Sequence, residues 1–280
     1  MKRAAIVIAV LGISAGTWAQ DKPTPQSAPS AQAAPAAQGK RAPAAKTQPE
    51  FDAYKAAIQL TDPAAAEKAA EDFSAKYPDS ELRVVLYKAA MQKYQANADK
   101  NLELAQKALA IDPDDPEALV TASQVLAEKT RDTDLDRDQK LAEAKKDAER
   151  ALVTVDNDVP TSGFPPEKID QFKRFIRSEA YAILGTLASN AKNYAEAETD
   201  LRKSIEAFPE QVDPVAVLRL AITLDMENKY ADALKYANQA VDLTKSQPDS
   251  PAAKAARSEQ DRLTKLSSGS APGQGAAPQK

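Results

Sequence analysis

The stretch Tyr181–Pro209 reads YAILGTLASNAKNYAEAETDLRKSIEAFP, and it decides the fold. Apolar residues keep a helical spacing through its first part up to Asn190, which predicts a helix ending there. Gly185 is the only glycine inside a helical pattern between residues 50 and 266. Since such a glycine costs about 1 kcal/mol relative to alanine, we expect close contact with a second helix at this position. Pro209 ends that second helix, because its ring cannot continue the hydrogen-bond ladder.

The spacing inside this stretch resembles the tetratricopeptide repeat. With Tyr181 at the fourth position of a thirty-four-residue unit, Gly185 falls at eight, Ala197 at twenty and Pro209 at thirty-two. The resemblance implies two antiparallel helices, with Gly185 and Ala197 lacking bulk where the backbones approach. The repeat signature consists of Tyr181, Leu184, Gly185, Ala197, Leu201 and Pro209.

Related units precede and follow this pair. The place of Gly185 is taken by Ser123 and Ala221 in two of them, and Ala233 matches Ala197. Four helices are predicted to begin with a capping residue followed by proline, at Asp62, Asp115, Asp213 and Ser250. Residues 50–266 therefore resemble an all-α protein, a right-handed α-solenoid of antiparallel helix pairs. We expect about five repeats and a polar C-terminal capping helix.

Both ends of the chain differ in composition from this domain. Lys2 and Arg3 precede an apolar run and a small-residue site, which predicts a signal peptide over residues 1–19, cleaved after Ala19. The alternative is an uncleaved membrane anchor. Residues 20–49 contain six prolines and no large apolar side chain, and we expect a disordered linker. Residues 267–280 are expected to form a disordered tail.

Composition excludes several functions. The chain has no histidine and no cysteine, so the usual general base, thiol nucleophiles and lipid attachment are absent. Glycine is too scarce for a phosphate-cradling loop. A formal net charge of −4 makes nucleic acid an improbable partner. We therefore expect no enzymatic activity and no cofactor. The signal peptide, with no cysteine after it for lipid attachment, predicts a location in the periplasm or outside a bacterial cell.

An acidic turn is the one candidate for metal chemistry. Its carboxylates stand at the places that a helix-flanked calcium loop uses, namely Asp132, Asp134, Asp136, Asp138 and Glu143. Arg137 occupies the place where such loops carry glycine, and Gln139 the place of a buried aliphatic residue. The alternative interpretation is a solvated turn that caps the following helix.

The resemblance also implies a partner site, because the first helices of such repeats line a concave groove. The positions carried over with this face are Val120, Gln124, Glu128, Thr186, Ser189, Asn190, Leu218, Ile222 and Asp225. The set of lysines and asparagines that forms the family's carboxylate clamp is not reproduced there, since Asn190 has no lysine beside it in this set, which argues against binding of chaperone tails. Leu218 and Ile222 would give the groove an apolar end that suits a helix or extended peptide.

These observations predict an exported, non-catalytic interaction scaffold of the bacterial cell envelope with a protein or peptide partner. We expect no membrane association after cleavage, and the polar last helix favours a monomer. The alternative is a calcium-dependent structural or sensing protein that uses the turn from Asp132 to Glu143.

Overall fold

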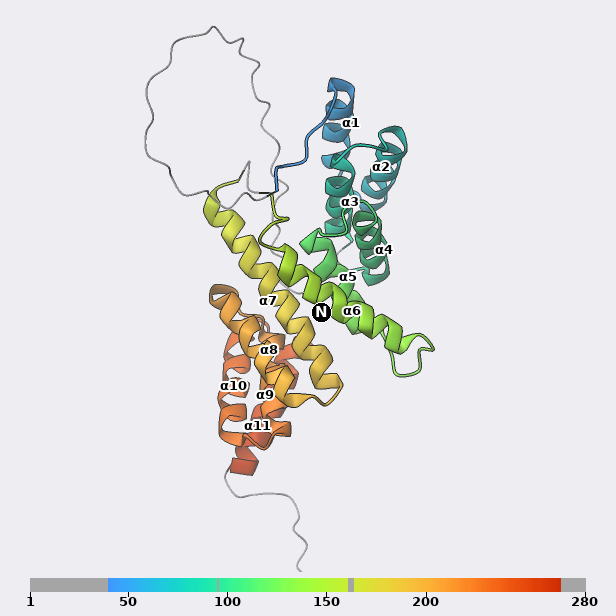
Figure 1. Ribbon diagram of the computed structural model, residues 1–280. Helices are drawn as coiled ribbons and strands as arrows, with labels where there is room; N and C mark the ends of the chain where they lie inside the picture. Colours follow the sequence, from blue (N-terminus) through green and yellow to red (C-terminus); the bar gives the residue numbers. More distant parts are fainter. Residues whose placement is uncertain (1–39, 95, 161–163, 268–280) are drawn as a thin grey trace, which may run out of the picture.

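The computed structural model describes residues 40–94, 96–160 and 164–267, which form eleven α-helices, one 3₁₀ turn and no strand (Figure 1). The helices are α1 (Gln48–Ile58), α2 (Pro63–Lys76), α3 (Leu82–Lys93), α4 (Ala98–Leu109), α5 (Pro116–Lys129), α6 (Arg137–Thr154), α7 (Pro166–Asn190), α8 (Tyr194–Ala207), α9 (Pro214–Met226), α10 (Tyr230–Leu243) and α11 (Pro251–Ser267).

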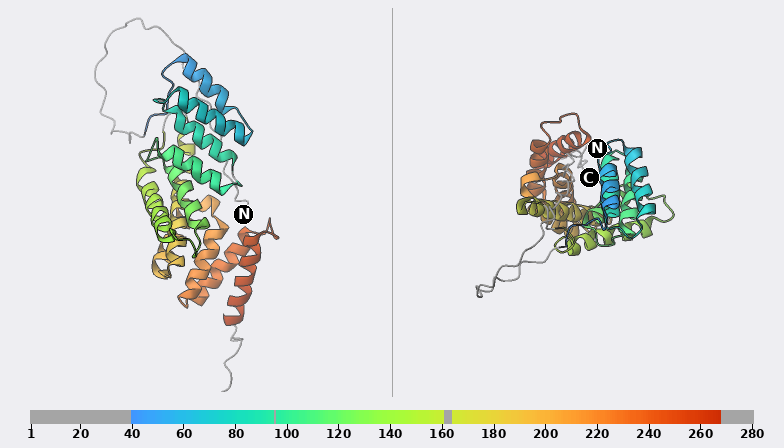
Figure 2. Two further views of the ribbon diagram at one scale, coloured as in Figure 1. Left: turned by 90° about the vertical axis from the view of Figure 1, so that its right-hand side faces the viewer. Right: turned by 90° about the horizontal axis from the view of Figure 1, so that it is seen from above.

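Consecutive helices pack as five pairs, α1/α2 to α9/α10, and α11 covers the last pair. The pairs follow one another along the molecule from α1 at one end to α11 at the other (Figures 1 and 2). The first helices of neighbouring pairs also touch. For example, α5 contacts α7, and α7 contacts α9. This arrangement confirms the predicted all-α solenoid of antiparallel helix pairs with a capping helix.

The predicted helix starts carry the expected caps. The side chains of Asp62, Asp115 and Asp213 accept hydrogen bonds from backbone N–H groups two or three residues further on, at 2.8–2.9 Å. Ser250 does the same at 3.2 Å. Each bond satisfies one of the N–H groups that a helix leaves unpaired in its first turn.

The seam between α7 and α8 holds the small and large side chains of the opening stretch. Ala197 and Leu201 are fully buried, and Leu184 is 8% exposed. A Cβ atom on Gly185 would lie 2.6 Å from Leu201 Cγ and 3.1 Å from its backbone nitrogen. Tyr181 lies at the edge of the seam, with the Lys203 ammonium 5.1 Å from its ring centre.

The second helix of this pair ends where the sequence predicts. α8 ends at Ala207, and Pro209 opens the 3₁₀ turn Pro209–Gln211. Phe208, between them, is 1% exposed.

The N-terminal boundary differs from the prediction. α1 begins at Gln48 and is capped by Thr47. Residues 40–47, which we name the strap, belong to the predicted linker but lie against the solenoid. Composition did not reveal that the strap is ordered, because the strap is held by its basic side chains and backbone and not by apolar side chains. Residues 1–39 and 268–280, with the expected signal peptide and most of the tail, lie outside the described residues.

Across the described ranges, we find no helix with both the length and the apolar character that crossing a membrane requires.

Candidate binding groove

A hollow lies where the first helices of the third, fourth and fifth pairs meet. It is lined by Gln124, Ala127 and Glu128 of α5, by Glu179, Ala182, Ile183 and Thr186 of α7, and by Asp213, Val215, Ala216 and Arg219 at α9. Its volume is about 20 Å³, which is room for roughly one water molecule. The hollow is therefore too small to hold a metabolite.

Three of the predicted groove residues line this hollow. Gln124 donates a hydrogen bond to Glu128 at 3.2 Å, one turn further along α5. Thr186 donates to the backbone oxygen of Ala182 at 2.7 Å. The first helices of two pairs thus present polar side chains that are held in place within their own helix.

Other predicted groove residues are covered by the neighbouring helix. Val120 is 5% exposed and belongs to a core cluster with Ile183 of α7. Ser189 lies 3.4 Å from the hydroxyl of Thr223 on α9. These positions face the first helix of the next pair, and the prediction that Val120 lines the groove was wrong.

The capping helix covers the last pair in the same way. Leu218 is 7% exposed and packs in a cluster with Ala256 of α11. Asp225 forms an ion pair with Arg262 of α11. Leu218 is therefore not the apolar end of the groove, because α11 takes the place of a further first helix.

An apolar surface nevertheless remains at this end. Ile222 is 40% exposed and Met226, four residues later on the same face of α9, is 51% exposed. Tyr230, the first residue of α10, is 41% exposed, and its hydroxyl donates to Asn228 at 2.7 Å. Asn190, at the end of α7, is exposed as well.

Arg219 joins the hollow to this apolar surface. It lines the hollow and precedes Ile222 by three residues, so that the two side chains lie near one face of α9. Sequence reasoning missed Arg219, because the repeat positions carried over pass from Leu218 to Ile222. We define the groove by its outward-facing residues, Gln124, Glu128, Glu179, Thr186, Val215, Arg219, Ile222 and Met226.

A largely buried ion-pair network joins α3 to the start of α5. Lys88 of α3 lies 2.8 Å from Asp115 and 3.1 Å from Glu117, and Gln92 donates to Glu117 at 3.0 Å. Burial alone would lower the pKa of Lys88, but the two carboxylates hold that pKa above its ordinary value. Glu117 is thus neutralised within the protein.

The acidic turn does not assemble the predicted calcium ligands. Arg137 lies 3.1 Å from Asp132 and 2.8 Å from Asp138, while Lys140 lies 3.0 Å from Asp136 and 3.7 Å from Asp134. Four of the five carboxylates therefore pair with two cations of the chain itself. The turn projects away from the solenoid (Figure 1), and Leu135 within it is fully exposed.

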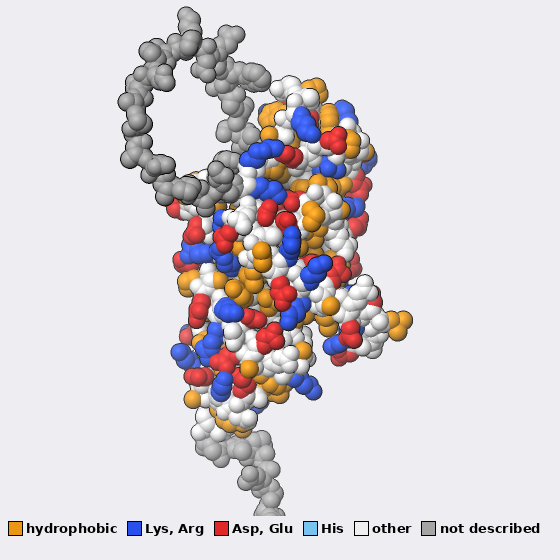
Figure 3. All heavy atoms as spheres, viewed as in Figure 1, with side chains coloured by type: hydrophobic (Ala, Val, Ile, Leu, Met, Phe, Trp, Pro, Cys, Tyr) orange, Lys and Arg blue, Asp and Glu red, His pale blue; other side chains and the backbone are white. Residues whose placement is uncertain are grey.

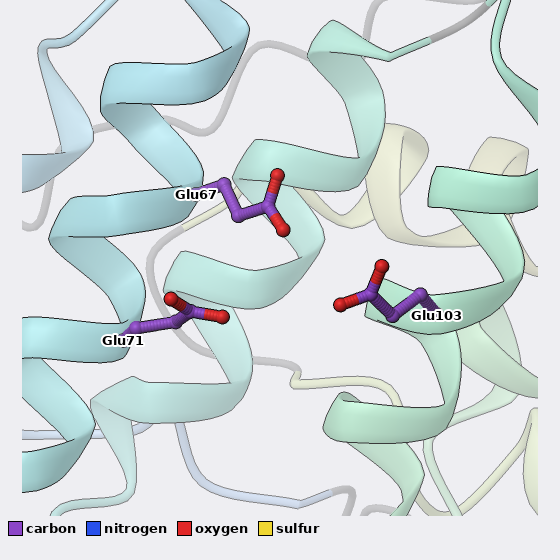
Figure 4. A group of neighbouring side chains, drawn as sticks. All are labelled: Glu67, Glu71 and Glu103. Carbon is purple, nitrogen blue, oxygen red and sulfur yellow. The ribbon is translucent and has the colours of Figure 1, made fainter.

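A different group of carboxylates converges in the part of the chain that the structure describes. Glu67 and Glu71 of α2 and Glu103 of α4 bring their oxygens within 4.8 Å of one another (Figure 4). Lys100 bridges Glu67 and Glu103 at 2.7 and 2.9 Å. Lys107 bridges Glu71 and Glu103 at 2.6 and 2.7 Å.

This group is an ion-pair network that joins the second helices of the first two pairs. The ammonium groups of Lys100 and Lys107 already pair with these three carboxylates. The cluster therefore needs no metal ion to offset the charges that it brings together. Elsewhere, on the face seen in Figure 3, acidic and basic side chains are interspersed without a continuous patch of either sign.

The described chain is thus an α-solenoid with a small hollow where the first helices of its third, fourth and fifth pairs meet. It matches no family model and no curated protein. Among solved structures, it is similar to an assembly chaperone of RpL4 (Acl4), residues 1–338, with 14% identity and a TM-score of 0.39. That similarity covers 79% of this chain and 97% of the other.

Proposed function

We propose that the protein is a non-catalytic interaction scaffold, a tetratricopeptide-like solenoid that binds a peptide or helix of a partner protein in the groove. The observation that carries this is the exposed pair Ile222 and Met226, which continues the hollow along α9. A helix or extended segment with apolar anchors fits such a surface. The polar residues of α5 and α7 would then contact the rest of the segment.

Groove binding is tested with the double variant I222D/M226D. Both side chains are partly exposed, so the solenoid tolerates the change, but two charges would meet the partner's apolar anchors. We expect capture of partners by a photo-crosslinker at Thr186 to fall at least about tenfold, because each buried apolar side chain contributes about 1.5–3 kcal/mol.

The matched control is L135D/V153D, which places the same charges at exposed apolar positions outside the groove. This control variant should capture the same partners, in the same amounts, as the unchanged protein. Circular dichroism checks that both variants fold. Equal losses in the two variants, or unchanged capture by I222D/M226D, would contradict binding in the groove.

We further propose export of the protein to the periplasm or cell exterior. The support is the charged and apolar order of residues 1–19 in the sequence. The intact mass of the protein isolated from its native cells tests this, since a cleaved chain begins at Gln20 and an uncleaved one retains the first nineteen residues.

A further inference from the structure

The turns that join successive pairs form an acidic edge of the solenoid. Those after α2, α4 and α6 carry Asp79 and Glu81, then Asp112 and Asp114, then Asp156 and Asp158. Glu81 directly precedes α3, where a negative charge is favourable at the N-terminal end of the helix. We name these three turns, residues 77–81, 110–115 and 155–160, the acidic edge.

Part of this charge is neutralised by arginines of the helices. Asp114 pairs with Arg150 of α6, and Asp156 pairs with Arg177 of α7. In the next turn along the chain, Glu210 pairs in the same way with Arg174 at 2.6 Å. These pairs join each turn to the helices packed directly on it.

The strap neutralises a different set of carboxylates. Lys40 pairs with Asp112 and lies 3.6 Å from Asp158, so one side chain joins two turns. Arg41 pairs with Glu81.

Backbone groups fix the course of the strap. The N–H of Lys40 donates to the backbone oxygen of Asn157 at 2.9 Å. The ammonium of Lys46 donates to the backbone oxygen of Asp79 at 2.8 Å, and its N–H donates to Glu50 at 2.6 Å. Ala45 packs against the first core cluster. The strap thus runs from the first pair to the turn before the fourth.

The forces that hold the strap are weak compared with those that hold the helices. The side chains of Arg41 and Glu81 are 68% and 44% exposed, and that of Lys40 is 35% exposed. Exposed pairs of this kind contribute little each and are screened by salt. The helices, in contrast, bury a continuous apolar core. A segment held in this way can open while the structure beneath it stays folded.

We propose that three carboxylates of the acidic edge, Glu81, Asp112 and Asp158, bind an extended basic segment, and that the strap is this segment, released by salt while the solenoid stays folded. While bound, the strap joins turns of pairs that are not neighbours in the stack. A solenoid otherwise transmits force only between adjacent repeats, so release of the strap loosens the first three pairs relative to one another.

The test removes the acidic partners and leaves the basic residues of the strap in place as trypsin sites. The strap variant is E81Q/D112N/D158N. The control variant is D114N/D156N/E210Q, which removes three carboxylates of inter-pair turns that are paired with helix arginines. Brief trypsin digestion of the full chain, followed by mass spectrometry, gives the rate of cleavage after Lys40, Arg41 and Lys46.

We expect cleavage at these sites to be faster by about threefold for each pair removed, roughly 30-fold in the strap variant, and near the unchanged rate in the control. Raising NaCl from about 0.05 to 0.5 M should accelerate cleavage of the unchanged protein in the same direction. The helical circular dichroism signal should stay constant throughout.

Three results would overturn the proposal. Equal cleavage rates in all three proteins would show that the acidic edge does not hold the strap. Rates independent of salt would exclude release by screening. Cleavage that accelerates only together with loss of the helical signal would show that the solenoid unfolds and that the strap has no separate opening.

Discussion

At the scale of a single residue, Gly185 marks a close approach of two helices. Its backbone approaches Leu201 so closely that a Cβ atom would lie 2.6 Å from a carbon of that side chain. At the equivalent place in the third pair, Ser123 is fully buried and its hydroxyl donates to the backbone oxygen of Ala144 at 2.6 Å. The fifth pair has Ala221 there, also fully buried. Close helix contact is thus the shared requirement, met by three different small residues.

We therefore expect Gly185→Ala to destabilise the protein although alanine is the better helix former. The gain in helix propensity is about 1 kcal/mol, while overpacking of a tight core costs about 1–3 kcal/mol. Gly185→Leu should lower the melting temperature much further. Thermal unfolding by circular dichroism measures both.

Asn190→Ala serves as the control for this series, because Asn190 is exposed at the end of the same helix. It should leave the melting temperature nearly unchanged. A stable Gly185→Leu protein would mean that α7 and α8 do not pack in the described register.

At the scale of helices, Glu198 connects the fourth pair to the fifth. This residue of α8 lies 2.7 Å from Arg202 and 2.5 Å from Lys229, which precedes α10. Arg202 in turn donates to the hydroxyl of Tyr236 at 2.7 Å. Burial opposes ionisation, but hydrogen bonds from Lys229 and Arg202 lower the pKa of Glu198 to about 2.

This lowered pKa predicts a dependence of stability on pH. The ordinary pKa of the group is 4.5, so its contribution is complete above that pH and is lost as the pH falls towards about 2. The melting temperature of the unchanged protein should exceed that of Glu198→Gln at pH 6. The difference should shrink steadily between about pH 5 and pH 2.

Glu206→Gln is the matched control, since Glu206 is an exposed residue of the same helix. Its melting temperature should follow that of the unchanged protein at every pH. A difference between the unchanged protein and Glu198→Gln that stays constant over the whole range would contradict a role for this ionised carboxylate.

At the scale of the whole molecule, α11 closes the C-terminal end of the stack. Its own residues Ala253, Ala256 and Leu263 are fully buried, and the helix packs on Val217 and Leu218 of α9. Because helices contact mainly their neighbours along the stack, a disturbance at this end should fade with distance.

Ala256→Asp tests this behaviour by burying an unpaired carboxylate under α11. We expect α11 to detach, and amide hydrogen exchange to become faster in α9 and α10 but not in α1 to α4. Ala255→Asp, one residue away and exposed, is the control and should leave exchange unchanged. Faster exchange throughout the solenoid would instead show that the stack unfolds as one cooperative unit.

The sequence by itself determined the helices, their caps and their pairing. Helical spacing, the Asp-Pro and Ser-Pro starts and the small residues at Ser123, Gly185 and Ala221 are local signals, and partners within a pair lie close in sequence. These signals were sufficient for the solenoid, and three of the positions predicted for the groove, Gln124, Glu128 and Thr186, line the hollow.

Only the tertiary structure decided which positions stay open. Val120 and Leu218 have the spacing of groove residues, but the next first helix and α11 cover them, which depends on how pairs stack. The strap is the clearest case, because Lys40 meets Asp112 across 72 residues of sequence. Composition assigns such a segment to a linker, since ion pairs between distant residues leave no periodic pattern in the chain.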